Sequence, residues 1–132
     1  MTLKISEADV KLAVAEWLQY AENQGKLYFE RLNAGEFIET RGATRRRIKG
    51  ASKGAADFFV LQAVSFSLTY AGVPFSHQPP LIPATSVTFI EVKKPEGGRQ
   101  SDDQKTFEVK VKQFNARYVI VTSVEQLEEC LR

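Results

Sequence analysis

The sequence VTFIEVKK, residues 87–94, predicts a buried β-strand that ends in charged side chains. Its first four residues are β-branched or aromatic, and such residues favour strands. Side chains alternate between the two faces of a strand, so Glu91 and Lys93 lie side by side on one face. A carboxylate and an ammonium at the end of an apolar strand must pair, bind an ion or face a cleft.

A second acidic residue stands at the start of another apolar strand, Asp57-Phe58-Phe59-Val60-Leu61. It follows Gly54, Ala55 and Ala56, whose small side chains let the backbone approach another segment closely. If this strand is a neighbour of the strand at 87–94, two carboxylates and one lysine converge at the strand ends. The sequence therefore predicts a polar site built from Asp57, Glu91 and Lys93.

The composition is that of one ordinary globular domain spanning residues 1–132. Hydrophobic residues make up 43% and charged residues 26% of the 132 residues, close to typical values. No apolar run approaches the roughly 18 residues that a membrane span needs. The single cysteine, Cys130, cannot form an internal disulfide bond, so we expect a reducing, cytoplasmic location.

The net charge is only +2, but the charges are unevenly distributed. A basic block lies in the middle of the chain and consists of Arg41, Arg45, Arg46, Arg47, Lys49 and Lys53. This basic block is either a solvated loop or a surface that binds a polyanion. Because the block directly precedes the segment 54–57, we expect it to border the cleft that holds the acidic residues.

The first half of the chain begins with a helix. Ser6 is a good N-cap, apolar residues recur at helical spacing from Val10 to Ala21, and Gly25 is a plausible end. Glu7 projects on the apolar side of this helix, so it faces the edge of the core. Alternatively, it is only a first-turn carboxylate that interacts favourably with the helix dipole. Residues 27–32 predict a strand, and residues 37–53 predict a hairpin or a loop.

The segment 63–86 has no clear periodicity. We expect a long connection that covers part of the core, with a short strand at 66–70 or a contact between subunits as alternatives. His77 lies in this segment and is interpreted as a surface residue.

The second half of the chain alternates helix and strand. Ser101 and Gln104 form a capping box for a helix whose buried face we assign to Phe107, Val111 and Phe114. Residues 117–122 predict a strand, and a second capping box at Ser123 predicts a short final helix. The predicted fold is α/β: a mixed central sheet of about four or more strands, flanked by helices, in the order α-β-β-β-α-β with a final helix.

These motifs, in this order, resemble the VRR-NUC branch of the PD-(D/E)XK nucleases. The matching pieces are Glu7, the segment 31–35 (RLNAG), the segment 54–57 (GAAD), the segment 91–93 (EVK) and the segment 101–104 (SDDQ). The resemblance covers nearly the whole chain. It departs from the family pattern at Ala56, which replaces the proline of the superfamily name, and in the long segment 63–86.

The resemblance implies a Mg²⁺-dependent DNA endonuclease, with Mn²⁺ as a substitute for Mg²⁺. Asp57, Glu91 and the Val92 carbonyl would hold the metal, Glu7 would complete the cluster, and Lys93 and Gln104 would assist catalysis. It also implies a homodimer that acts on branched DNA such as a Holliday junction. Residues assigned to DNA contacts are Arg31, Asn33, Arg45, Arg46, Arg47, Lys49, Lys53, Lys94 and Arg99.

Each assignment has a structural alternative. Glu91 and Lys93 could form an ion pair only, and Gln104 is explained by its capping box alone. Arg31 and Asn33 are either turn residues or part of the rim of the site. The alternative for the whole protein is a nucleic-acid-binding module with the same fold and no cleavage activity.

Overall fold

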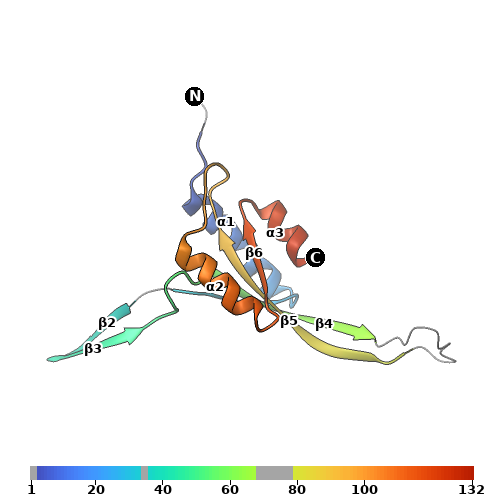
Figure 1. Cartoon of the computed structure of the whole chain (residues 1–132), viewed down its shortest axis with the longest axis horizontal. Helices are drawn as coiled ribbons and strands as arrows, with labels where there is room; N and C mark the ends of the chain where they lie inside the picture. The colour runs from blue at the N-terminus through green and yellow to red at the C-terminus, as the bar shows by residue number, and fades with distance from the viewer. Residues whose placement is uncertain (1–2, 34–35, 68–78) are drawn as a thin grey trace.

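The computed structural model describes residues 3–33, 36–67 and 79–132 (Figure 1). Its elements follow the predicted order of helix, strands, helix, strand and helix. They are α1 (Glu7–Asn23), β1 (Tyr28–Arg31), β2 (Glu36–Arg41), β3 (Thr44–Lys49), β4 (Phe58–Ser67), β5 (Leu81–Val92), α2 (Asp102–Lys112), β6 (Arg117–Val121) and α3 (Val124–Leu131).

Four strands form a mixed sheet in the order β1-β4-β5-β6. β4 pairs antiparallel with β1 and β5, whereas β6 runs parallel to β5. A parallel pair needs a crossover connection, and α2 supplies it between β5 and β6. The predicted α/β fold with a mixed, helix-flanked sheet is therefore confirmed. Residues 87–92 of the strand predicted at 87–94 belong to β5, an inner strand of the sheet, and Lys93 and Lys94 lie just beyond its end.

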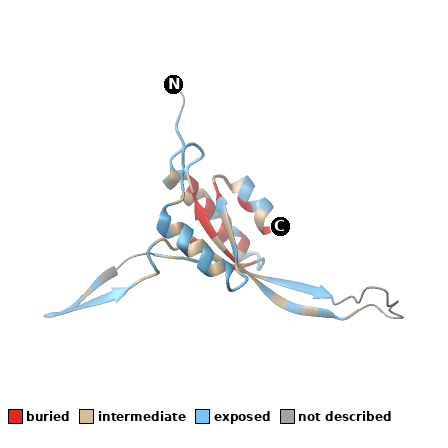
Figure 2. Cartoon of the chain, in the orientation of Figure 1, coloured by how far each residue is buried: buried red, intermediate tan, exposed pale blue. Residues whose placement is uncertain are grey.

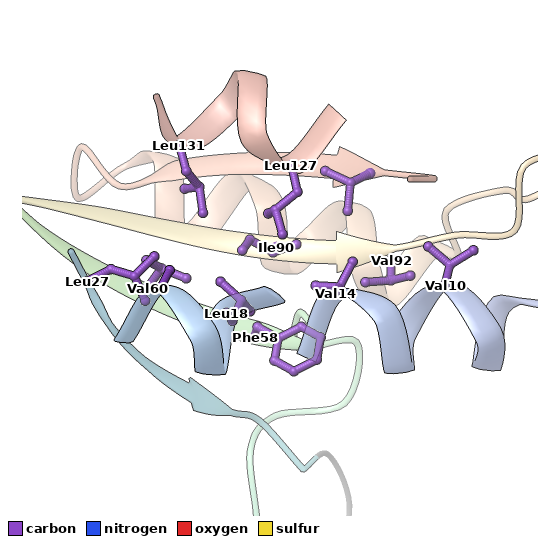
Figure 3. Close-up of a cluster of buried hydrophobic side chains, with 12 residues drawn as sticks. Val10, Val14, Leu18, Leu27, Phe58, Val60, Ile90, Val92, Leu127 and Leu131 are labelled. Atoms are coloured by element: carbon purple, nitrogen blue, oxygen red, sulfur yellow. The ribbon is translucent and has the colours of Figure 1, made fainter. Parts of the chain in front are cut away.

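The core lies between one face of the sheet and the helices α1 and α3 (Figure 3). Val14 and Leu18 of α1 meet Phe58 of β4 and Ile90 of β5, and all four are fully buried. Burying each such side chain contributes about 1.5–3 kcal/mol. Because the strand residues alternate, this face is set by every second residue of β4 and β5.

The opposite face of the sheet carries α2. Phe107 of α2 packs edge-on against Phe89 of β5, with ring centroids 5.3 Å apart. Its ring is also 6.3 Å from that of Tyr118 in β6. Phe107 therefore faces the sheet, as predicted, but it and Val111 are only half-buried, and no side chain of α2 is fully buried. Phe114, predicted on the same face, is instead 83% exposed, because α2 ends at Lys112 and the chain turns away there.

The three helices begin at the predicted N-caps. The Ser6 hydroxyl accepts from the Asp9 amide and the Asp9 carboxylate accepts from the Ser6 amide at α1. Ser101 and Gln104 form the predicted reciprocal pair at α2. At α3 the Ser123 hydroxyl accepts from the Gln126 amide. A capping box also needs the Gln126 side chain to accept from the Ser123 amide. Gln126 Oε1 instead accepts from the Thr122 amide, so this half of the prediction is wrong.

The structure contains one of the two forms expected for residues 37–53, but it departs from the expectation for residues 63–86. β2 and β3 form a separate two-stranded hairpin, the first of the two structures expected for residues 37–53. The described parts of the segment 63–86, residues 63–67 and 79–86, do not cover the core as expected. Its described residues extend β4 and β5 as a two-stranded ribbon that projects beyond the helices (Figure 2). The predicted strand at 66–70 lies partly outside the described residues, and His77 lies wholly outside them.

None of the helices in the described residues is long and apolar enough to cross a membrane.

Candidate active site

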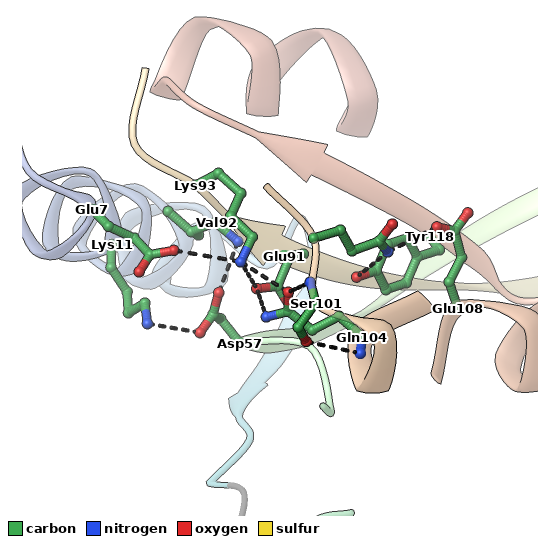
Figure 4. Close-up of polar contacts among 11 residues, drawn as sticks. Glu7, Lys11, Asp57, Glu91, Val92, Lys93, Ser101, Gln104, Glu108 and Tyr118 are labelled. Carbon is green, nitrogen blue, oxygen red and sulfur yellow. Dashed lines mark hydrogen bonds and ion pairs between the residues drawn. The ribbon is translucent and has the colours of Figure 1, made fainter. Parts of the chain in front are cut away.

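Asp57 and Glu91 meet at one end of the paired strands β4 and β5. The register Phe58↔Ile90 places Asp57, one residue before β4, opposite Glu91. Two hydrogen bonds fix this arrangement: the Asp57 amide donates to the Ile90 carbonyl at 2.9 Å, and the Val92 amide donates to Asp57 Oδ2 at 2.7 Å. Figure 4 shows the two carboxylates in one cluster. The predicted convergence of these two residues is present.

Lys93 lies beside Glu91, as the strand alternation predicted. Its Nζ is 3.3 Å from Glu91 Oε1 and donates to Gln104 Oε1 at 2.9 Å. The Gln104 amide nitrogen donates in turn to Glu91 Oε1 at 2.7 Å. These three side chains form a closed triangle, so the ammonium is held in one position.

Gln104 both caps α2 and contacts Lys93 and Glu91, the two roles that the sequence left as alternatives. Its Oε1 accepts from the Ser101 amide at 2.8 Å, which completes the capping box of α2. The same oxygen accepts from Lys93, and the amide nitrogen contacts Glu91. The start of α2 is therefore fixed to the acidic strand end.

α1 contributes two charged residues from its first two turns. Glu7 Oε1 is 3.8 Å from Lys93 Nζ, and the Glu7 side chain is 42% exposed at the rim of the cluster. Lys11, one helical turn later, places Nζ 2.8 Å from Asp57 Oδ1. Glu7 thus lies at the core edge, where the helix phase predicted it.

Glu91 is the most deeply buried charged residue of the cluster, at 2% exposure. Burial raises the pKa of its carboxyl group to about 7, the nearby Asp57 carboxylate adds to the rise, and Lys93 and Lys11 oppose it. Glu91 Oε2 is buried and has no hydrogen-bond partner among the described residues. A buried oxygen without a partner is costly, so this atom suits a ligand.

The cluster combines three carboxylates, from Glu7, Asp57 and Glu91, with two ammonium groups, from Lys11 and Lys93. Within the described ranges, no three His, Cys, Asp or Glu side chains are arranged as a ready metal centre. Glu7 faces Lys93 and does not join Asp57 and Glu91 in such a centre. The two carboxylates fit Mg²⁺, which often uses one or two carboxylates and several waters.

The predicted DNA-contacting residues lie in three places. Arg31 and Asn33 are exposed at the end of β1, where the Leu32 amide donates to the Asp57 carbonyl at 2.9 Å. They therefore border the segment that carries Asp57. Lys94 and Arg99 are exposed in the turn between β5 and α2.

Apart from Lys53, the basic block is on the β2–β3 hairpin, which projects from the body of the molecule (Figure 1). Along β3 the side chains of Arg45, Arg46, Arg47 and Lys49 are exposed. Lys53, beyond the hairpin, lies 3.4 Å from Asp103 in the first turn of α2. The hairpin connects directly to the segment before Asp57, but its strands do not pair with the main sheet.

Sequence reasoning missed Lys11 as a member of the site. The available signal was its spacing of four residues from Glu7, which places both on one side of α1. That spacing alone does not show that this side of the helix reaches Asp57.

Comparisons with protein-family models, with curated proteins and with solved structures give no match for this chain.

Proposed function

We propose that this protein is a divalent-metal-dependent nuclease that hydrolyses phosphodiester bonds in DNA. The observation that carries the proposal is the meeting of Asp57 and Glu91 at one strand end, beside an ammonium held by two partners. Removing these charges from water costs free energy that ion pairing often does not fully offset, and such clusters are common at functional sites. The VRR-NUC resemblance supports the same assignment.

Asp57, Glu91 and the Val92 carbonyl are the groups that would hold Mg²⁺ or Mn²⁺. When bound, such a cation stabilises charge on a phosphate and lowers the pKa of a water. Oxygen atoms are the ligands that both cations prefer. The unpartnered Glu91 Oε2 gives the buried carboxylate a free lone pair for this purpose.

Lys93 supplies a fixed positive charge next to this position. Gln104 and Glu91 hold its Nζ, and the side chain is only 12% exposed. A preorganised charge stabilises a developing anion without reorganisation during the reaction, and this is often a large term in catalysis. Gln104 acts through Lys93 and Glu91 as a positioning residue.

The exposed arginines and lysines of the β2–β3 hairpin would supply affinity for the DNA backbone. Phosphate contacts add electrostatic affinity but do not read base sequence. We therefore expect selectivity for the shape of DNA, with branched DNA as the first substrate to test. The rival proposal, binding without cleavage, predicts salt-sensitive binding that needs no metal.

The test is cleavage of branched and linear DNA with Mg²⁺, with Mn²⁺ and with EDTA. We expect Asp57→Asn, Glu91→Gln and Lys93→Met each to lower the rate by at least about 100-fold. Glu129→Gln on α3 and Lys110→Met on α2 are matched controls, since both residues are exposed. Undiminished, EDTA-resistant cutting by the three site variants would refute the proposed site. Metal-independent binding without any cutting would favour the rival.

A further inference from the structure

Lys11 is a partly buried ammonium group whose partner belongs to the candidate site. It lies in α1, one helical turn after Glu7, and its Nζ is 2.8 Å from Asp57 Oδ1. Figure 4 shows Lys11 meeting Asp57, whereas Lys93 meets Glu91. Partial burial of a charge costs free energy even when the charge is paired, so the position of Lys11 calls for an explanation.

The carboxylate oxygens of Asp57 and Glu91 differ in how firmly they are held. Asp57 Oδ2 accepts from the Val92 amide at 2.7 Å, and Glu91 Oε1 accepts from Gln104 Nε2 at 2.7 Å. Glu91 Oε2 has no hydrogen-bond partner among the described residues. Asp57 Oδ1 contacts Lys11, a long side chain that can move away. A divalent cation shared by Asp57 and Glu91 would therefore compete with Lys11 for Asp57 Oδ1.

The net charge of the cluster decides whether it attracts a phosphate. With Glu91 ionised, the three carboxylates and two ammonium groups leave one net negative charge, which repels a phosphodiester. With a divalent cation the sum becomes one net positive charge, equal and opposite to that of one phosphodiester group. Without Lys11 the same site would be neutral. Lys11 therefore supplies the positive charge that remains for a phosphate once a cation is bound.

Of the two ammonium groups, Lys11 is the one that can change its partner. Lys93 Nζ donates to Gln104 Oε1 at 2.9 Å, lies 3.3 Å from Glu91 Oε1 and 3.8 Å from Glu7 Oε1, and its side chain is 12% exposed. The Lys11 side chain is 27% exposed. Its ammonium group is a compact charge on a flexible stem of four carbons, so it can turn toward solvent without a change in the backbone.

We infer that Lys11 leaves Asp57 when Asp57 binds a divalent cation, and that the released ammonium group then binds a phosphate of the DNA. The inference rests on the proposed function and adds a substrate-contacting residue that couples DNA binding to cation binding. Such coupling is reciprocal, because the cation strengthens DNA binding by the factor by which DNA strengthens cation binding. The competing partner for the released group is Glu7, since a glutamate four residues before a lysine is well placed to pair with it.

Fluorescence anisotropy of a labelled branched DNA, titrated with the full chain in EDTA and in Ca²⁺ at equal ionic strength, tests the inference. Ca²⁺ takes oxygen ligands, and a gel shows that the DNA is intact after each titration. We expect Ca²⁺ to tighten DNA binding about 10-fold or more in the wild type, and no more than about threefold in Lys11→Met. Lys26→Met, at an exposed position after α1, is the matched control and should keep the wild-type response.

Two further measurements separate a lost phosphate contact from other effects of the substitution. Calorimetric titration with Ca²⁺ in the absence of DNA should show that Lys11→Met binds the cation at least as tightly as the wild type. Weaker DNA binding then cannot result from a lost cation. Lys11→Gln removes the charge but keeps a side-chain amide that can donate to Asp57, and it should give the same loss of coupling. Far-UV circular dichroism checks that each variant is folded.

Equal tightening by Ca²⁺ in the wild type and in Lys11→Met would overturn the inference, because Lys11 would then stay on Asp57 or move to Glu7. A loss of DNA affinity that is the same in EDTA and in Ca²⁺ would overturn it as well, since that loss reflects net charge alone. If the wild type nevertheless cuts DNA with Mg²⁺, the proposed nuclease function stands without the inference. Coupling that depends on Lys11 in a protein that does not cut DNA would support the inference and refute the nuclease function.

Discussion

Lys11 Nζ lies 2.8 Å from Asp57 Oδ1, so an ammonium from the first helix neutralises a carboxylate at the start of β4. Both side chains are partly buried, at 27% and 17% exposure. The pair links α1 to the strand end on which the candidate site depends. It also places a positive charge where a divalent cation would be attracted.

Replacing Lys11 by Met should therefore strengthen the binding of Mn²⁺ to the DNA-free protein. The variant removes the cation that competes for Asp57, and we expect an affinity gain of several-fold to about 10-fold. Calorimetric titration with Mn²⁺ measures this gain. Lys26→Met, at an exposed position after α1, is the control. Unchanged or weaker Mn²⁺ binding by Lys11→Met would contradict the competition.

The raised pKa of Glu91 predicts how stability depends on pH in the metal-free protein. The folded-state pKa is about 7 against an ordinary 4.5, so the folded state retains a proton that the unfolded state releases. The stability that the folded state gains by retaining this proton is fully present below about pH 4.5 and is lost as the pH rises through about 7. It amounts to about 3 kcal/mol at most.

Glu91→Gln should remove this pH dependence. We expect chemical denaturation to show the variant more stable than the wild type at about pH 8 and close to it at about pH 4. The amide replaces a buried carboxylate at nearly equal volume, so packing is kept. A variant less stable than the wild type at about pH 8 would mean that Glu91 serves mainly as a structural ion pair.

Two variants separate the role of Gln104 in capping α2 from its role in positioning Lys93 and Glu91. Ser101→Ala removes one half of the capping box and should cost about 1 kcal/mol of stability with little change in cleavage rate. Gln104→Ala removes the cap together with the hydrogen bonds to Lys93 and Glu91, and should also lower the cleavage rate about 10–100-fold. Equal rates for the two variants, each measured with saturating Mg²⁺, would reduce Gln104 to a capping residue.

The parts of the fold that depend on local sequence were predictable. Ser6 and Ser101 are N-caps because their hydroxyls reach amides three residues on, a contact within one helical turn. The pairing of Asp57 with Glu91 was also inferable, because each residue marks the end of an apolar strand. Lys11 was not, since its contact with Asp57 depends on where α1 lies on the sheet.

The two-stranded ribbon formed by residues 62–67 and 81–86 has a sequence signal that was only partly used, since a short strand at 66–70 was one of the alternatives. Val64 and Phe66 alternate with Ala63, Ser65 and Ser67, which is the period of a strand. Pro83 obscured the partner strand, because proline is rare in strands except at edges. In this ribbon β5 pairs only with β4, because β6 begins opposite Thr88, so Pro83 lies on an edge, where it is tolerated.

Gly54 should tolerate no side chain. Its φ is +82°, and a Cβ there would lie 2.4 Å from the backbone of Asp103 in α2. Gly54→Ala must therefore move the segment that carries Asp57 away from α2, and we expect a loss of more than about 2 kcal/mol together with loss of cleavage. Gly42→Ala is the control, since φ is +58° there but nothing lies within 4 Å. Thermal melts that show equal destabilisation of both variants would exclude the steric cause.

The basic hairpin should contribute to DNA binding without contributing to folding. Arg45 and Lys49 are exposed on β3, which pairs only with β2 in the described structure. The double variant Arg45→Gln/Lys49→Gln should leave the melting temperature unchanged and weaken DNA binding. The slope of log affinity against log salt should become shallower by about 1 for each phosphate that is no longer neutralised. Lys105→Gln/Lys110→Gln on α2 carries the same charge change at exposed positions away from the hairpin. If that control lowers the slope equally, the effect reflects net charge and not binding by the hairpin.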